Sequence, residues 1–231
     1  MVKGSTTAQD QKKKSAHLSE VESKDFVRKA GIPVVDTVLA QSKAEAMSLA
    51  RHLGFPVALK VISSDIVRKS DIGGVKLGLQ SARNVGAAYS EIITSVRNRQ
   101  PSAKVEGMSV QKMARPGVEV IIGMNKDPQF GPVLMFGLGG ILVEVLKDVS
   151  FRIVPLTRRD ATEMIREIKG FPILQGYRGS EPVKISVLED LLLKLSTFTD
   201  KHPEIKEIDL NPIFAYRYSA VAVDARVILE S

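Results

Sequence analysis

The decisive stretch of this sequence reads Glu207-Ile208-Asp209-Leu210-Asn211-Pro212-Ile213 and, after a turn, Ala220-Val221-Ala222-Val223-Asp224-Ala225-Arg226. These segments predict two short apolar strands with a tight connection, in which Asp209, Asn211 and Asp224 stand among Ile, Leu and Val. Carboxylates are costly to bury without a partner, and hard oxygen ligands suit Mg²⁺, particularly when phosphates complete its coordination. A simpler interpretation remains open, in which Asp209 and Asn211 form a turn before Pro212 and Asp224 is a solvated strand residue.

The composition is that of a globular protein. The 231 residues are 44% hydrophobic and 26% charged, and the chain contains no cysteine, which excludes disulfides, thiolate zinc sites and a cysteine nucleophile. Neither a membrane-length apolar run nor the apolar core of a signal peptide is present, so we expect a cytoplasmic protein without membrane contact. The net charge of +7 suits nucleotide phosphates, a CoA-type ligand, an acidic subunit or nucleic acid. Because tryptophan is absent and only 5% of residues are aromatic, we expect no nucleic-acid binding.

Hydrophobic periodicity predicts an α+β fold with two lobes. Residues 1–17 are polar and basic and are expected to form a mobile arm. The lobe boundary is expected near residues 110–117, which gives an N-terminal lobe at 18–110 and a C-terminal lobe at 111–231. The predicted helices are 20–30, 43–53, 82–98, 158–169 and 186–199, and the predicted strands are 55–62, 75–79, 107–113, 118–124, 133–137 and 151–156.

Two features of the N-terminal half could bind phosphate. Lys60 is the one charge within the strand 55–62, and a lysine half-buried there needs an anion, although an edge-strand lysine that discourages aggregation is the simpler alternative. Gly73-Gly74 lets backbone amides approach phosphate oxygens, with Arg68, Lys69 and Lys76 supplying positive charge. The segment lacks the Gly-Lys-Ser/Thr ending of a P-loop, and a plain hairpin would also explain it.

Four blocks, in order along residues 18–231, closely resemble the ATP-grasp subunit of the ADP-forming acyl-CoA synthetases, which are relatives of succinyl-CoA synthetase. The resemblance implies an ATP-grasp fold that holds ATP between two lobes, and the reaction acyl-CoA + ADP + phosphate ⇌ acid + CoA + ATP. It also implies a hetero-oligomer, because the CoA-binding subunit, whose histidine is phosphorylated and swings towards the nucleotide, is a separate chain. The blocks are Lys69-Ser70-Asp71-Ile72-Gly73-Gly74-Val75, residues 127–140, Val143-Glu144-Val145-Leu146-Lys147-Asp148 and Asp209-Leu210-Asn211-Pro212.

The same resemblance implies roles for individual residues. Asn211 and Asp224 correspond to Mg²⁺ ligands, and Asp209 takes the place of a glutamate that receives the histidine of the partner. A carboxylate there would orient an imidazole and stabilise its charge. The implied nucleotide contacts are Lys60 for the phosphates, the turn Gly73, Gly74, Val75 and Lys76 over them, Gln111, Lys112, Met113 and Ala114 as the adenine hinge, and Glu119 for the ribose.

Arg68 departs from the family pattern. Relatives usually have histidine there, in a Leu-His-Lys-Ser-Asp string, and that histidine is held to be a second phosphoryl carrier. A guanidinium stays charged and is not a phosphoryl nucleophile, and none of His17, His52 and His202 looks like a replacement. Two hypotheses follow: an enzyme subunit that relays phosphate, or a nucleotide-binding or regulatory module impaired in the relay. A basic nucleic-acid-associated protein is a third.

Overall fold

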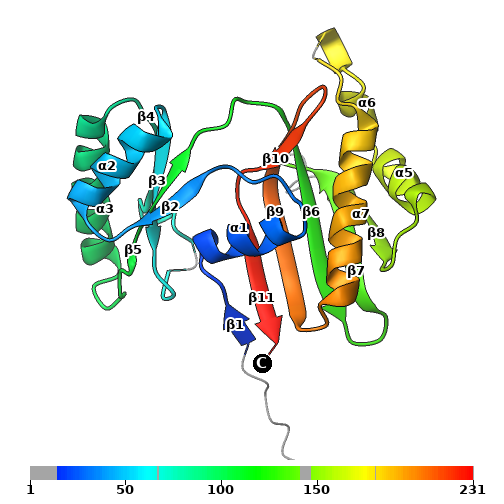
Figure 1. The fold of residues 1–231 in the computed structure, drawn as a ribbon, viewed down its shortest axis with the longest axis horizontal. Helices are drawn as coiled ribbons and strands as arrows, with labels where there is room; N and C mark the ends of the chain where they lie inside the picture. Colours follow the sequence, from blue (N-terminus) through cyan, green and yellow to red (C-terminus); the bar gives the residue numbers. More distant parts are fainter. Residues whose placement is uncertain (1–14, 67, 141–146, 180, 231) are drawn as a thin grey trace, which may run out of the picture.

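The computed structural model describes residues 15–66, 68–140, 147–179 and 181–230, and these form two lobes that lie side by side (Figure 1). Each lobe has its own antiparallel sheet and its own core of buried apolar side chains. The predicted α+β fold with two lobes is therefore correct. None of the helices within the described residues is both long enough and apolar enough to span a membrane.

The smaller lobe is a four-stranded sheet packed against two helices. Its strand order is β2-β5-β3-β4, and its neighbours pair antiparallel. Ser42 and Ser81 cap the two helices by accepting backbone N–H bonds, which satisfies amides that a helix start leaves free. The elements are β2 (Thr37–Ala40), α2 (Lys43–Leu53), β3 (Val57–Ile62), β4 (Val75–Leu79), α3 (Ala82–Arg99) and β5 (Gly107–Lys112).

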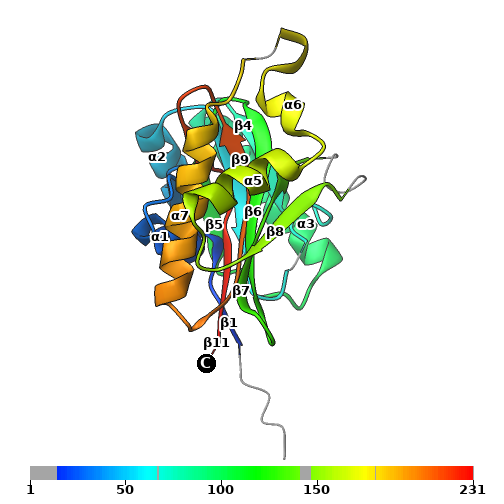
Figure 2. The same ribbon diagram turned by 90° about the vertical axis from the view of Figure 1, so that its right-hand side faces the viewer.

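The larger lobe is a sheet in the order β1-β11-β9-β6-β7-β8, with β10 paired beside β9. The helices α1 and α7 lie on one side of this sheet, with α5 packed beside α7 (Figures 1 and 2). The elements are β1 (Ser15–His17), α1 (Glu20–Lys29), β6 (Val118–Asp127), β7 (Gly131–Leu138), β8 (Val149–Ile153), α5 (Arg158–Glu167), α6 (Phe171–Leu174), the 3-10 turn η1 (Tyr177–Gly179), α7 (Ile185–Lys201), β9 (Ile205–Ala215), β10 (Ala220–Ala222) and β11 (Arg226–Glu230).

The structure corrects the expected boundaries at the N-terminal side. Residues 15–17 do not belong to an arm, because β1 pairs with β11; residues 1–14 lie outside the described residues. The helix α1 packs in the larger lobe rather than the N-terminal one, since its buried Val27 joins the core of that lobe. The chain after α1 stays there too, as Ala222 N–H donates to Pro33 O at 2.8 Å. The smaller lobe therefore spans about residues 37–112.

Candidate active site at the junction of the lobes

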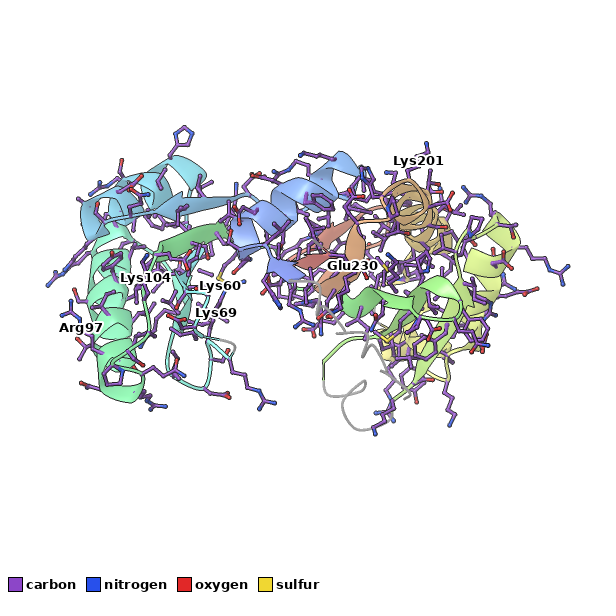
Figure 3. The ribbon with its side chains drawn as sticks, turned by 90° about the horizontal axis from the view of Figure 1, so that it is seen from below. Lys60, Lys69, Arg97, Lys104, Lys201 and Glu230 are labelled. Atoms are coloured by element: carbon purple, nitrogen blue, oxygen red, sulfur yellow. The ribbon has the colours of Figure 1, made fainter. Side chains whose placement is uncertain are left out.

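Lys60 joins the two lobes. Its strand β3 lies between β5 and β4, so the edge-strand interpretation of this lysine is wrong. The side chain is buried, and Nζ donates to Glu20 Oε1 at 2.8 Å and to Asp224 Oδ2 at 3.1 Å. Glu20 begins α1 and Asp224 lies between β10 and β11, so both acceptors come from the larger lobe. Figure 3 shows Lys60 and Lys69 together on the side of the smaller lobe that faces the larger one.

Glu20 is the centre of a buried cluster of charges. A capping box between Ser19 and Glu22 fixes the first turn of α1, and this turn carries Glu20 into the junction. Its carboxylate accepts from Lys60 and from Lys24 at 2.9 Å, and Lys69 Nζ lies 3.4 Å away. Burial alone would raise the pKa of Glu20, but the ammonium groups of Lys60, Lys24 and Lys69 outweigh it and lower this pKa from 4.5 to about 2. Glu20 is therefore ionised at neutral pH.

Lys24 connects this cluster to the adenine-hinge segment expected from the sequence. The side chain is 1% exposed, and Nζ donates to Glu20, to Thr37 Oγ1 at 2.9 Å and to Gln111 Oε1 at 2.8 Å. An ammonium has three N–H bonds, so all the donors of Lys24 are in use. Burial lowers the pKa of Lys24, and the nearby Glu20 carboxylate opposes that shift. Gln111, at the start of the expected hinge, is therefore held by a residue of the opposite lobe.

The sequence analysis missed Glu20 and Lys24. A signal for them exists, because Glu20, Lys24 and the core residue Val27 are spaced four and three apart, which places them on one face of a helix. Charged residues on the face that a helix buries call for partners. An i,i+4 Glu-Lys pair on a predicted helix is nevertheless usually a solvated pair, and no local feature distinguishes the two cases.

Asp209 and Asn211 both lie within β9, so the interpretation that they form a turn is wrong. Ile208 and Leu210 are buried in the core of the larger lobe, and strand alternation therefore directs Asp209 to the opposite face. On that face Asp209 stands between Gly123 of β6 and Arg226 of β11. Burial raises the pKa of Asp209, although Arg226 opposes the shift.

Asn211 and Asp224 lie on adjoining segments. Val223 N–H donates to Pro212 O at 2.9 Å, which sets the residue before Asp224 against the residue after Asn211. Asp224 Oδ1 accepts from the backbone N–H of Ala225 at 2.9 Å, while Oδ2 faces Lys60. The described residues contain no group of three His, Cys, Asp or Glu side chains that could hold a metal alone. One amide and one carboxylate oxygen fit a Mg²⁺ site in which phosphates supply further ligands.

The glycine turn before β4 is tightly built. Gly73 adopts a φ of +68°, and a side chain at Gly74 would meet Val61 at 2.6 Å and the carbonyl oxygen of Lys69 at 2.8 Å. The backbone N–H groups of Gly73 and Gly74 donate to Ser70 O and Lys69 O within the turn. Val75 pairs with Lys60 across the β4-β3 ladder, and Lys76 Nζ donates to Glu91 at 2.6 Å. In this conformation the turn positions Lys60, while its amides and Lys76 have partners of their own.

The remaining expected nucleotide contacts surround the β5-β6 connection. Lys112 N–H donates to Asp36 O, and Met113 N–H donates to Pro56 O. Ala114 follows at the start of the connection, where the chain passes to the larger lobe. Glu119 is exposed on β6, and a side chain built on Gly140 would meet its Oε2 at 3.1 Å.

Arg68 is not brought into the cluster. Its side chain is 84% exposed, and its nearest charged partner is Asp71 at 3.9 Å. The motif Val143-Glu144-Val145-Leu146 lies outside the described residues. Of the expected phosphate-binding residues, Lys60 lies at the junction and Arg68 stands away from it.

Comparison with known proteins gives the family. An ATP-grasp domain model matches residues 9–229. The chain is 50% identical over 212 residues to the Acetate--CoA ligase [ADP-forming] I subunit beta of Pyrococcus furiosus, covering 92% of this chain and 91% of that one. The chain belongs to the ATP-grasp family of ADP-forming acid–CoA ligase beta subunits.

Solved structures agree with this assignment. The dinucleotide forming acetyl-coenzyme A synthetase 1 of Ca. Korarchaeum cryptofilum, in complex with coenzyme A, Ca-AMPCP and HgCl+, matches with a TM-score of 0.90 and 48% identity over 96% of both chains. A second structure of that protein, with coenzyme A and Mg-AMPPCP, has its phosphohistidine segment pointing towards the nucleotide binding site; it matches with a TM-score of 0.81 and 45% identity, covering 93% of both chains. The predicted ATP-grasp fold and ligase family are confirmed.

Proposed function

We propose that this chain is the nucleotide-binding subunit of a cytoplasmic ADP-forming acyl-CoA synthetase. With a CoA-binding partner subunit it would convert acyl-CoA, ADP and phosphate into the acid, CoA and ATP. The observation that carries the proposal is the 3.1 Å contact between Lys60 and Asp224, one from each lobe. A phosphate-binding cation and a metal-binding carboxylate thus meet where the ATP-grasp family would hold its nucleotide.

Lys60 and Asp224 neutralise each other in this conformation. A nucleotide phosphate is a stronger partner for Lys60, and Mg²⁺ is a stronger partner for Asp224. We infer that Mg²⁺ and ADP replace this ion pair together, with Asn211 and Asp224 holding the metal and Lys60 and Lys69 holding the phosphates. When bound, the metal would neutralise phosphate charge. Mg²⁺ alone would leave Lys60 with only Glu20 as a partner, and ADP alone would leave Asp224 without a cation, so we expect the two to bind cooperatively.

Asp209 is the proposed receiver of the phosphohistidine of the partner. The phosphoryl group would leave the imidazole nitrogen as the N–P bond breaks, and a terminal phosphate oxygen of ADP would form the new O–P bond. The imidazole could then take up a proton, and the Asp209 carboxylate would stabilise that positive charge. Most of the catalysis would come from positioning and charge neutralisation.

Calorimetric titration of the chain with ADP at saturating Mg²⁺ tests the nucleotide site. Lys60→Met should weaken ADP binding by about tenfold to a hundredfold, the range for losing one charge-assisted contact. Lys201→Met is the matched control, because Lys201 ends α7 far from the junction (Figure 3). Equal affinities for Lys60→Met and Lys201→Met, or no ADP binding by the wild-type chain, would overturn the assignment.

A nucleotide-binding or regulatory module is the second candidate function, and the exposed Arg68 is the observation that favours it. The two candidates differ in turnover. The chain would be combined with its CoA-binding subunit, identified by co-purification and mass, and acyl-CoA-dependent ATP formation would be followed. Turnover supports the ligase subunit, whereas intact ADP binding without turnover supports the module.

A further inference from the structure

The buried cluster divides its lysines into two kinds. Lys24 has all its N–H bonds engaged by Glu20, Thr37 and Gln111, so it can offer nothing to a ligand. Within the described residues Lys60 uses two N–H bonds, and Lys69 meets only Glu20. The side chain of Lys69 is also 26% exposed. The donors still available at the junction therefore belong to Lys60 and Lys69.

Both available lysines are held by one carboxylate. Oε1 of Glu20 accepts from Lys60 at 2.8 Å, and Oε2 faces Lys69 at 3.4 Å, while the side chain of Glu20 is 3% exposed. The lysines come from β3 and from the loop before β4, and among the described residues no hydrogen bond joins one to the other. Without an anion between them, the two ammonium groups would repel and take separate rotamers.

We propose that Glu20 is a positioning residue of the nucleotide site, which holds Lys60 and Lys69 with their remaining N–H bonds directed at the phosphates. The inference rests on the proposed function. The cluster keeps three ammonium groups against the carboxylates of Glu20 and Asp224, so it retains positive charge for phosphate. Glu20 itself would not touch the nucleotide.

The test compares ADP, which carries phosphates, with adenosine, which does not, by titration of the full chain at saturating Mg²⁺. Glu20→Gln keeps the shape of the side chain and removes its charge, and it should weaken ADP binding about tenfold while adenosine binding changes less than twofold. Glu20→Asp keeps the charge on a shorter stem, and it should restore part of the lost ADP affinity. Asp25→Asn is the matched control on the same helix, where Asp25 is exposed, and should bind both ligands as the wild type does.

The outcomes separate the inference from the function beneath it. If the wild-type chain binds ADP and Glu20→Gln binds it with the same affinity, the proposed role of Glu20 is overturned and the proposed function still stands. An equal loss for ADP and adenosine also overturns it, because a general structural role would not distinguish the phosphates. If Glu20→Gln does not fold, Glu20→Asp decides by the same ADP-to-adenosine comparison. Absence of ADP binding by the wild-type chain overturns both.

Discussion

Glu20 and Asp209 are two carboxylates of the larger lobe, the first buried and the second half-buried, and their pKa values are shifted in opposite directions. The lysines around Glu20 outweigh its burial and lower its pKa to about 2. At Asp209 burial prevails and the pKa is raised. The difference lies in the partners: Glu20 receives two short hydrogen bonds from ammonium groups, while the neighbour of Asp209, Arg226, donates to Glu207 instead.

Within the described residues no hydrogen bond or ion pair reaches the side chain of Asp209. Asp209 is half-buried. A carboxylate that is withdrawn from water without a partner reduces stability, and such residues occur preferentially at functional sites. Glu20 is thus satisfied within this chain, whereas the carboxylate of Asp209 receives no hydrogen bond from the described residues. This contrast supports the proposal that Asp209 receives the histidine of the partner, and the predictions below test it.

The largest effect is expected from removing the carboxylate of Asp209. Asp209→Ala in the reconstituted complex should slow phosphoryl transfer to ADP by about 10²- to 10⁴-fold, the usual range for a group that assists proton transfer or charge development. Binding of Mg-ADP should stay within about twofold of wild type, because Asp209 is not among the residues proposed to hold nucleotide or metal. Rapid-quench measurement of ATP formation and calorimetry give the two values.

Asp224→Ala serves as the opposite control, because it should weaken Mg-nucleotide binding itself. Should Asp209→Ala weaken ADP binding as strongly as Asp224→Ala does, Asp209 would belong to the nucleotide site, and the contrast with Glu20 would lose its meaning.

The next effect concerns acid stability. The pKa of Glu20 is about 2 in the folded protein and 4.5 without its partners. A carboxylate with a lowered pKa stabilises the fold fully above pH 4.5, and this contribution is lost as the pH falls from about 4.5 to 2. The upper limit is about 3 kcal/mol. Glu20→Gln should therefore lower the free energy of unfolding at pH 7 and flatten its fall below pH 4.5, as measured by urea denaturation. A parallel pH profile for wild type and variant would show that the lysines do not lower this pKa.

Much of this architecture could be predicted from the sequence, because alternation, periodicity and caps are local signals. Lys60 was identifiable as the one charge within an apolar strand, whereas Asp224, which was also expected in a strand, lies in the connection between β10 and β11. The role of α1 was not, since nothing in residues 20–29 shows which lobe will bury Val27. The contacts of Glu20 with Lys60 and of Lys24 with Gln111 span 40 and 87 residues, and only the folded chain brings them together.

Arg68 lies next to the cluster in sequence yet outside it in space, and a smaller effect is expected there. Arg68→His should raise phosphoryl transfer in the reconstituted complex by about two- to tenfold, because imidazole can carry a phosphoryl group and guanidinium cannot. Arg97→His on the exposed end of α3 is the matched control. An unchanged transfer rate for Arg68→His would remove position 68 from the phosphoryl route and leave Asp209 as the proposed dock.

The smallest effect is on the stability contribution of Asp209. A raised pKa means that the ionised carboxylate is less favourable in the folded protein than in the unfolded one, so its contribution to stability falls as the pH rises through the usual value of 3.8. Asp209→Asn should therefore increase the free energy of unfolding at pH 7, and the gain should disappear near pH 3. Urea denaturation at both pH values would show it, with Asp25→Asn as the exposed control. Asp209→Asn should also slow phosphoryl transfer. A variant that is more stable but less active would mark Asp209 as a carboxylate retained for the partner subunit. Loss of stability at pH 7 would instead mean that Asp209, like Glu20, is already satisfied within its own chain.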